Sequence, residues 1–328
     1  PFIVSAMGSH GGGTEEGQRE VLAGYGITEE RLGVPVVTTV DTVYLGNCAN
    51  GRPVWFDRAA YEADLIVPIN RVKLHTDFVG PIQSGLCKML VIGLGNHKGC
   101  SAVHEEAPEV FADAIEETAR LILQKAPVGF GIAILENAYD KTYAVEAVPA
   151  EHLVEREKEL VQIAKGNMPY IMLDEADVIV CGAIGKDISG AGFDPNILGR
   201  SSVLKQFVLH IPRYQRLVLC DVTPASHGNG IGVGLFDVIT KKVAEQLDLE
   251  SMYANAIACN CLGDASVPCT VDDEETAIRV ALKCCRNIDR DHPRIIRIQN
   301  TLHLGEIEVS EALLDAVRAD SRMSLIEN

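Results

Sequence analysis

NRVKLHTDFVGPIQSGLCKMLVIGLGNHKGCSAVH, residues 70–104, is the stretch around which the rest of the chain is organised. It combines three histidines, five glycines and a lysine enclosed by apolar neighbours. The apolar run that leads into it, Asp64 to Asn70, predicts a buried strand. His75 then follows the carboxyl end of that strand, which is where open α/β sheets bind their ligands. This position favours a functional role for His75.

Lys88 is the lysine with apolar neighbours, and it lies in a segment, Ser84 to Gly95, that predicts a helix or turn bounded by glycines. Burial disfavours the charged form of a lysine and lowers its pKa, so the amine becomes a nucleophile or a point of covalent attachment near neutral pH. In the alternative interpretation the side chain extends along its aliphatic stem to the solvent. This segment alone leaves both interpretations open.

The length and charge of the chain restrict its class. With 328 residues the chain is long enough for two domains, each with its own core. The formal net charge of −17 gives no field that would attract nucleic acid or an anionic membrane. We therefore expect neither partner, and an anionic substrate would have to be bound by local positive groups. An oligomer is compatible with the sequence.

The ten cysteines predict reduced thiols rather than a disulfide framework, because several lie inside apolar runs. No CxxC pair occurs, which argues against a structural zinc site. The sequence contains neither a signal peptide nor a run of eighteen apolar residues, so we predict a cytoplasmic protein. The chain starts at Pro1 directly in a predicted strand, and we expect that an N-terminal segment is missing.

A glycine-rich loop follows the first predicted strand, Phe2 to Met7. The loop residues Gly8 to Gly13 include His10, and Thr14 is the predicted N-cap of a helix that reaches about Tyr25. A strand, a glycine loop and a helix in this order allow backbone N–H groups to face an anion. The alternative is that the loop only makes a tight turn and that His10 hydrogen-bonds within it.

The rest of the chain alternates predicted strands and helices, which indicates an α/β fold in both halves. The predicted strands are residues 34–37, 131–135, 143–148, 176–185, 217–222 and 294–298, and the predicted helices are residues 58–63, 107–125, 149–165, 235–247, 276–285 and 309–319. Residues 49–52 predict a hairpin turn. The charged helix 149–165 is the predicted link between two α/β domains, residues 1–168 and 169–328, with the active site in the cleft between them.

Taken together, these segments resemble the nickel-dependent lactate racemase family, and in particular an uncharacterised subgroup with the same N-terminal domain. The segment GSHGGGTEEG, residues 8–17, is similar to the family's glycine-rich histidine loop. VKLHTDFVG, residues 72–80, is similar to its strand-end histidine segment, and SGLCKMLVIGLG, residues 84–95, to its lysine segment. IGKDISGAGFDPN, residues 184–196, looks like the loop of the C-terminal domain that closes over cofactor and substrate.

The resemblance implies a role for each of these histidines and for the lysine. His10 and His75 would be the two catalytic bases, Lys88 would tether the pyridinium nickel-pincer nucleotide, and His104 would be the nickel ligand. Lys186 would be a cation on the side of the substrate. The residues to which the resemblance gives cofactor-binding roles are Gly11, Gly12, Ser84, Gly85, Lys186 and Asp187.

The implied function is that of an isomerase, a racemase or epimerase of a 2-hydroxy acid, with hydride transfer to the cofactor and one base on each side of the substrate. The enzymes that make the cofactor would be its partners. Two departures from the family pattern leave the substrate open: the spacing from His75 to Lys88 is longer, and Leu86 and Cys87 replace a glycine and an alanine. The family's Asp-His-Thr-Arg segment would lie upstream of Pro1.

Two other function classes fit the same residues. One is a divalent-metal hydrolase or lyase that uses His10, His75 and His104 without the pincer cofactor. The other is a non-enzymatic protein that binds a nucleotide or anion on the same fold. We interpret Cys87 as a packing residue, and His104 could alternatively cap the helix that follows it. His227 is the only further histidine to which a function could be given.

Overall fold

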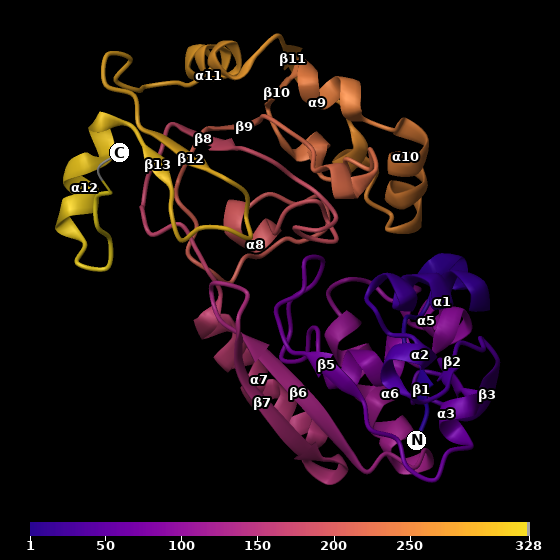
Figure 1. Cartoon of the computed structure of the whole chain (residues 1–328). Helices are drawn as coiled ribbons and strands as arrows, with labels where there is room; N and C mark the ends of the chain where they lie inside the picture. The colour runs from indigo at the N-terminus through magenta and orange to yellow at the C-terminus, as the bar shows by residue number, and fades with distance from the viewer. Residues whose placement is uncertain (327–328) are drawn as a thin grey trace. The chain divides into compact units, whose positions relative to one another are not determined.

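The structure, a computed structural model, describes residues 1–326 and divides into two compact units (Figure 1). Unit 1 contains residues 1–137 and 141–168, and unit 2 contains residues 138–140 and the chain from Pro169 onward. Helices and strands occur together in both units, so the fold class is α/β, as predicted.

Unit 1 is built from two short strand pairs, one three-stranded sheet and the helices that pack on them. Its elements are β1 (Ile3–Val4), α1 (Glu15–Gly24), α2 (Glu29–Leu32), β2 (Val36–Val37), β3 (Thr42–Asn47), β4 (Pro53–Asp57), α3 (Arg58–Tyr61), β5 (Ile69–Arg71), α4 (Leu86–Lys88), a π-helix (Met89–Gly93), α5 (Asn96–His104), α6 (Phe111–Lys125), β6 (Phe130–Glu136), β7 (Thr142–Pro149) and α7 (Leu153–Asn167). β1 pairs with β2 in parallel, and β3 with β4 as an antiparallel hairpin. β5 and β6 are parallel, and β6 and β7 are antiparallel.

The start of the first helix confirms the predicted N-cap at Thr14, and the second helix starts in the same way. The Thr14 hydroxyl accepts a hydrogen bond from the Gly17 amide at 3.1 Å, and the Thr28 hydroxyl accepts one from the Arg31 amide at 3.3 Å. Each threonine has extended backbone angles, which an N-cap residue requires. The hairpin turn predicted at residues 49–52 and the antiparallel strands around residues 131–135 and 143–148 are also present.

The strand predicted for Asp64 to Asn70 is wrong in both extent and burial. β5 begins only at Ile69, whose side chain is 54% exposed. Pro68 precedes it and has no amide hydrogen to donate, so the pairing cannot extend continuously toward Asp64. One isolated bridge, between Ile66 and Val128, remains of the upstream part.

Helix α6 is amphipathic as predicted and buries Phe111, Ile115 and Ile122. In contrast, α7 is not a solvated link. It buries Leu153, Leu160 and other residues, and it packs on β6 and α4 within unit 1. Exposed charged residues such as Glu155 and Glu159 made the helix look more solvated than it is.

Unit 2 contains a six-stranded sheet in the order β11-β10-β9-β8-β12-β13, in which only β13 is antiparallel to its neighbour. Its elements are β8 (Val178–Cys181), α8 (Pro195–Leu198), β9 (Arg216–Leu219), β10 (Val238–Thr240), α9 (Lys241–Gln246), α10 (Leu249–Ala258), β11 (Cys269–Val271), α11 (Glu274–Lys283), β12 (Ile295–Ile298), β13 (Glu308–Val309) and α12 (Leu314–Ala319). The chain moves outward from β8 to β11 and then returns to the other side of β8. The strand order therefore reverses between β8 and β12, and α/β sheets bind ligands at the carboxyl ends of strands at such a point.

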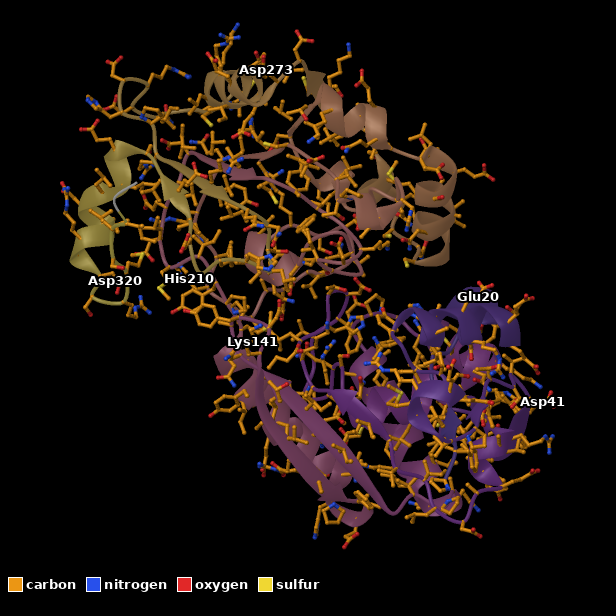
Figure 2. The ribbon with its side chains drawn as sticks, viewed as in Figure 1. Glu20, Asp41, Lys141, His210, Asp273 and Asp320 are labelled. Carbon is orange, nitrogen blue, oxygen red and sulfur yellow. The ribbon has the colours of Figure 1, made fainter. Side chains whose placement is uncertain are left out.

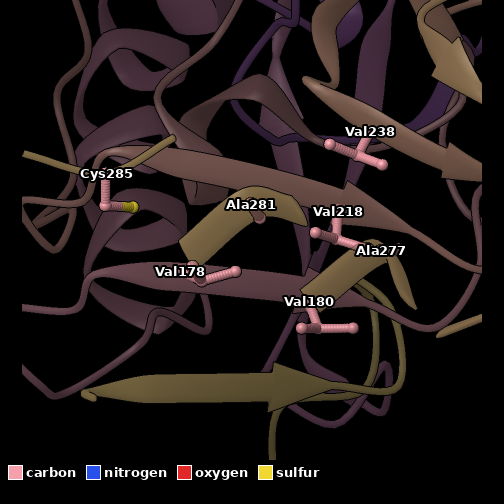
Figure 3. Close-up of a cluster of buried hydrophobic side chains, with 7 residues drawn as sticks. All are labelled: Val178, Val180, Val218, Val238, Ala277, Ala281 and Cys285. Carbon is pink, nitrogen blue, oxygen red and sulfur yellow. The ribbon is translucent and has the colours of Figure 1, made fainter. Parts of the chain in front are cut away.

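A valine-rich core joins this sheet to α11 (Figure 3). The cluster consists of Val178, Val180, Val218, Val238, Ala277, Ala281 and Cys285. The alanines let the helix approach the sheet closely, and the β-branched valines favour the strand conformation. The same preference explains one wrong prediction, because Val238, Ile239 and Thr240 form a strand where we expected the start of a helix. The predicted C-terminal helix is likewise shorter, and α12 begins only at Leu314.

Acidic side chains such as Glu20, Asp41 and Asp273 are exposed at the surface, in keeping with the net negative charge (Figure 2). All ten cysteines are free thiols, as predicted. Within residues 1–326, no helix has the length and apolar character needed to cross a membrane.

Candidate functional site

Lys88 and His75 are in direct contact. The Nζ atom of Lys88, the last residue of α4, is hydrogen-bonded to Nε2 of His75, which lies in the loop after β5. The backbone N–H of His75 donates to Oε1 of Gln83 at 2.8 Å, and the backbone N–H of Asp77 donates to Nδ1 of His75 at 3.0 Å. The imidazole is thus held on both sides. The Lys88 amine points toward His75. The alternative, in which the side chain extends to the solvent, is therefore wrong.

The hydrogen bonds determine which protonation states suit this pair. Because Nδ1 of His75 accepts the Asp77 amide, the proton of the neutral ring belongs on Nε2, where it faces Lys88. Nε2–H can donate to Lys88 only if the amine is neutral. Burial, with the nearby Lys88 and Lys73 charges, lowers the pKa of His75 well below its ordinary value. Burial also lowers the pKa of Lys88 to about 8. The His75 ring and the Lys88 amine can therefore both be uncharged while they are in contact near pH 8.

The segment that carries Lys88 has an uncommon helical form. Met89 to Gly93 is a π-helix, and its residues Leu90 to Gly93 are buried. Single π-helical turns occur frequently at functional sites. A Cβ atom on Gly93 would lie 2.7 Å from the carbonyl oxygen of Ala6, so glycine is required where this segment meets the chain that follows β1.

His104 is the last residue of α5, and its side chain is held by the helix itself. Its Nδ1 atom lies 2.8 Å from the carbonyl oxygen of Cys100, to which it donates in the neutral tautomer. This leaves Nε2 as the nitrogen with a lone pair, and the side chain is exposed. Metal-binding histidines commonly donate their second ring N–H to a backbone carbonyl in this way. The capping alternative is wrong, because Val110 is the N-cap of α6.

A row of aromatic rings connects the two histidines. The ring of His75 stacks on Phe78 with centroids 4.3 Å apart, and Phe78 lies 4.9 Å from Phe111. Phe111 in turn meets His104 edge-on at 5.0 Å. The structure thus brings His75, Lys88 and His104 into one cluster. No sequence pattern indicated a role for Phe78, and Phe111 looked like an ordinary core residue of an amphipathic helix.

The loop that carries His10 is anchored to the same segment. The backbone N–H of Gly8 donates to the carbonyl of Gly93 at 3.0 Å, and the Ser9 hydroxyl lies 3.8 Å from the thiol of Cys100. His10 itself is exposed, and its backbone N–H donates to Met7 at 3.1 Å. The loop with His10 therefore lies beside α5, the helix that ends in His104.

The three glycines after His10 form a short 3₁₀-like turn with left-handed backbone angles, φ of 64°, 68° and 66° for Gly11, Gly12 and Gly13. Residues with a side chain rarely adopt this conformation. Gly11 also has no room for a side chain, because a Cβ atom would lie 2.5 Å from the backbone of Gly17. The glycine sequence is thus required by the shape of the loop.

Cys100 is a site residue that the sequence prediction missed. Its thiol lies 3.5 Å from Nδ1 of His104 and also contacts Ser9. Burial acts to raise the pKa of this thiol, but the hydrogen bonds with His104 and Ser9 lower it overall. The hydrogen bond with Cys100 raises the pKa of His104. The signal was present in the sequence, since residues i and i+4 of a helix share one face.

In the part of the chain that the structure describes, no three His, Cys, Asp or Glu side chains form a group that could hold a metal ion. The three-histidine centre of the hydrolase alternative is thus not assembled among residues 1–326.

Lys186 and Asp187 lie in the loop after β8, at the end of the sheet where the strand order reverses. Nζ of Lys186 donates to the carbonyl of Gly190 at 2.6 Å and to Asn255, and Asp187 accepts from the Thr223 hydroxyl. Both side chains therefore stabilise the loops of unit 2.

His227 is exposed and has a left-handed backbone, with φ of 48°, at the end of a short 3₁₀ turn. Histidine is among the residues that tolerate this conformation better than most. Its place in the structure is that of a turn residue.

The chain is similar to known proteins in its N-terminal sequence and in its fold. Residues 2–113 match the sequence model of the lactate racemase N-terminal domain. The lactate racemase apoprotein from Thermoanaerobacterium thermosaccharolyticum has a similar structure, with a TM-score of 0.50 and 13% sequence identity over 92% of this chain and 77% of that chain. A protein from Thermotoga maritima has a TM-score of 0.44 and 12% identity over 94% of this chain and 73% of its own. A search of curated proteins found no match.

The matched residues include His10, His75, Lys88 and His104. At 13% identity, the likeness to the racemase structure shows a shared fold. The similarity to lactate racemase therefore consists of a domain match over residues 2–113 and a shared fold.

Proposed function

We propose that the chain is a racemase or epimerase of a 2-hydroxy acid that uses a nickel-pincer nucleotide tethered to Lys88. The observation that carries this proposal is the contact of Lys88 with His75, in a domain that matches the lactate racemase N-terminal domain. A neutral buried amine is a nucleophile and can form a covalent bond to a cofactor.

The residues around Lys88 suit such a cofactor. The Lys88 amine would form the covalent link, and Nε2 of His104 would bind the metal while Nδ1 stays on the Cys100 carbonyl. Imidazole nitrogen is a suitable donor for Ni(II). We further assign Gly11, Gly12, Ser84 and Gly85 to the same group by their place in the family's motifs. When bound, the cofactor supplies reversible acceptance of the hydride from the substrate carbon.

His75 and His10 would handle the hydroxyl proton of the substrate. Inversion of a carbon centre needs an acid or base on each of its two faces. His75 suits the role of base because its lowered pKa keeps the ring neutral at physiological pH. In the tautomer with the proton on Nε2, it would take up the substrate proton at Nδ1 and release the Asp77 amide. His10 is exposed on the glycine-rich loop. Lys186 and Asp187 stay predictions, as do a cytoplasmic location and cofactor-making enzymes as partners.

The function is tested by incubating the protein, purified from its native host, with single enantiomers of a panel of 2-hydroxy acids and following optical purity by chiral chromatography. We expect at least one acid to be converted toward the racemate or epimer mixture. Metal analysis and intact-mass measurement of the same sample should detect nickel and a covalent adduct. Unchanged stereochemistry in a sample that carries the adduct would instead support a binding protein.

The reactivity of Lys88 should depend on pH with a midpoint near 8. Its pKa of about 8 means that half of the amine is neutral at that pH, against ~0.4% for an ordinary lysine. Trace labelling of the cofactor-free protein with acetic anhydride, followed by peptide mass spectrometry, measures this midpoint. The exposed Lys98 in the same protein is the internal reference. A midpoint for Lys88 above pH 10 would contradict a neutral buried amine.

His104→Gln should separate metal binding from covalent attachment. We expect the loaded variant to keep the organic adduct but to lose nickel by at least about tenfold, because even indirect supports of a metal ligand contribute that much. Elemental analysis and intact mass on the same sample measure the two quantities. His97→Gln, a change of an exposed histidine in the same helix, is the matched control. Equal nickel in the two variants would remove His104 as the ligand.

A further inference from the structure

Glu157 is a buried carboxyl group beneath the segment that carries Lys88. It belongs to α7 and has no exposed surface, whereas the neighbouring acids Glu155 and Glu159 are exposed. Its Oε2 atom accepts a hydrogen bond at 2.9 Å from the backbone N–H of Cys87, in the first turn of α4. Burying a carboxyl group is unfavourable unless it is hydrogen-bonded. We therefore expect the buried Glu157 carboxyl group to have a structural role at α4.

Gly85 fits closely against this carboxyl group. A Cβ atom at Gly85 would lie 2.7 Å from the carboxyl carbon of Glu157 and 2.8 Å from each of its oxygens. The carbonyl of Gly85 accepts hydrogen bonds from Nδ2 of Asn70 at 2.9 Å and from the Met89 amide at 3.0 Å. The residue before it, Ser84, pairs with the backbone of Lys73. Glycine at position 85 thus lets the carboxyl group reach the start of the helix.

The direction of the Lys88 side chain depends on the orientation of this first turn. Lys88 is the last residue of α4, one residue after the amide that Glu157 holds. A rotation of the turn would therefore move the Lys88 amine away from the ring of His75. A free helix start also has unpaired N–H groups, and a carboxylate is the acceptor that suits them best.

We propose that Glu157 is a positioning residue, whose carboxyl oxygen fixes the first turn of α4 and thereby holds Nζ of Lys88 against Nε2 of His75. The importance of that contact for cofactor attachment rests on the proposed function. The positioning itself is a property of the cofactor-free chain. Burial raises the pKa of Glu157 to about 7, and its hydrogen-bond donors are the backbone amides at the start of α4, so an accepting oxygen is present on both sides of that pH.

Acetylation of Lys88 in the cofactor-free protein, measured over pH as above, tests the role of Glu157. Glu157→Ala removes the acceptor, and Glu157→Asp retracts it by one methylene group. In both variants we expect the labelling midpoint to rise by one pH unit or more, which lowers the labelling rate at pH 7 by about tenfold or more. Glu157→Gln retains an accepting oxygen and should stay within a few tenths of a unit of the wild type. Glu159→Gln on the exposed face of α7 is the matched control.

Near-UV circular dichroism establishes that each variant is folded, and if the alanine variant is not, the aspartate variant decides. A wild-type midpoint in a folded Ala or Asp variant would overturn the positioning role, and so would a Gln variant that behaves like the Ala variant. These outcomes differ from a failure of the proposed function. In that case the wild-type Lys88 itself would label like an ordinary lysine, whatever residue stands at position 157.

Discussion

Lys88→Ala should abolish covalent attachment of the nickel-pincer nucleotide, and with it all racemisation above background. The amine of Lys88 is the only reactive group in α4, and its contact with His75 and its lowered pKa make it a nucleophile near neutral pH. Neither of the other two side chains of α4 can take its place, because Leu86 is apolar and burial raises the pKa of Cys87 well above its ordinary value. Intact-mass measurement of protein produced together with the cofactor-making enzymes gives the result.

Two variants separate chemistry from packing in this experiment. Lys88→Arg keeps a long cationic side chain but is always protonated, so it should also lack the adduct. Lys98→Ala removes an exposed lysine that lies over the Trp55 ring, and it should keep the adduct in full. An adduct of unchanged mass on the Lys88→Ala protein would contradict the proposed tether.

The parts of the fold that sequence patterns predicted are those fixed by neighbouring residues. Thr14 caps its helix through the amide of the residue three positions away, and the hairpin of β6 and β7 follows from two alternating strands and a short turn. Predictions failed where a single residue or a contact with a distant part of the chain determined the extent or the burial of an element. Pro68 prevents the early start of β5, and the buried face of α7 depends on strands of the sheet that it covers.

The candidate site shows the same division. The sequence identified His10, His75, Lys88 and His104 as residues of interest, because their types and order resemble a known family. It could not show that Lys88 contacts His75, because the contact depends on the path of the loop between them. It also could not reveal Glu157, which reaches the Lys88 segment from a helix 70 residues further along the chain. Such partners arise from tertiary packing and leave no local pattern.

His75→Gln should reduce racemisation strongly while the cofactor stays attached. The glutamine amide can reach toward Lys88 in place of Nε2, but it cannot take up a proton. Loss of a positioned acid or base costs about 100- to 10,000-fold in rate. The two directions of racemisation should fall by the same factor, because the enantiomers have equal free energies. Chiral chromatography from each pure enantiomer measures both rates, normalised to the fraction of protein with the adduct by intact mass.

The pH profile tests the same assignment independently. A base is active only when unprotonated, so activity falls as the pH decreases through its pKa. Burial lowers the pKa of His75 well below 6.5, so the acid limb due to this residue should lie below pH 6.5 and be absent from the residual activity of His75→Gln. His152→Gln, at an exposed histidine of unit 1, should leave rate and profile unchanged. A His75→Gln enzyme that carries the adduct and turns over at the wild-type rate would show that the second base is another residue.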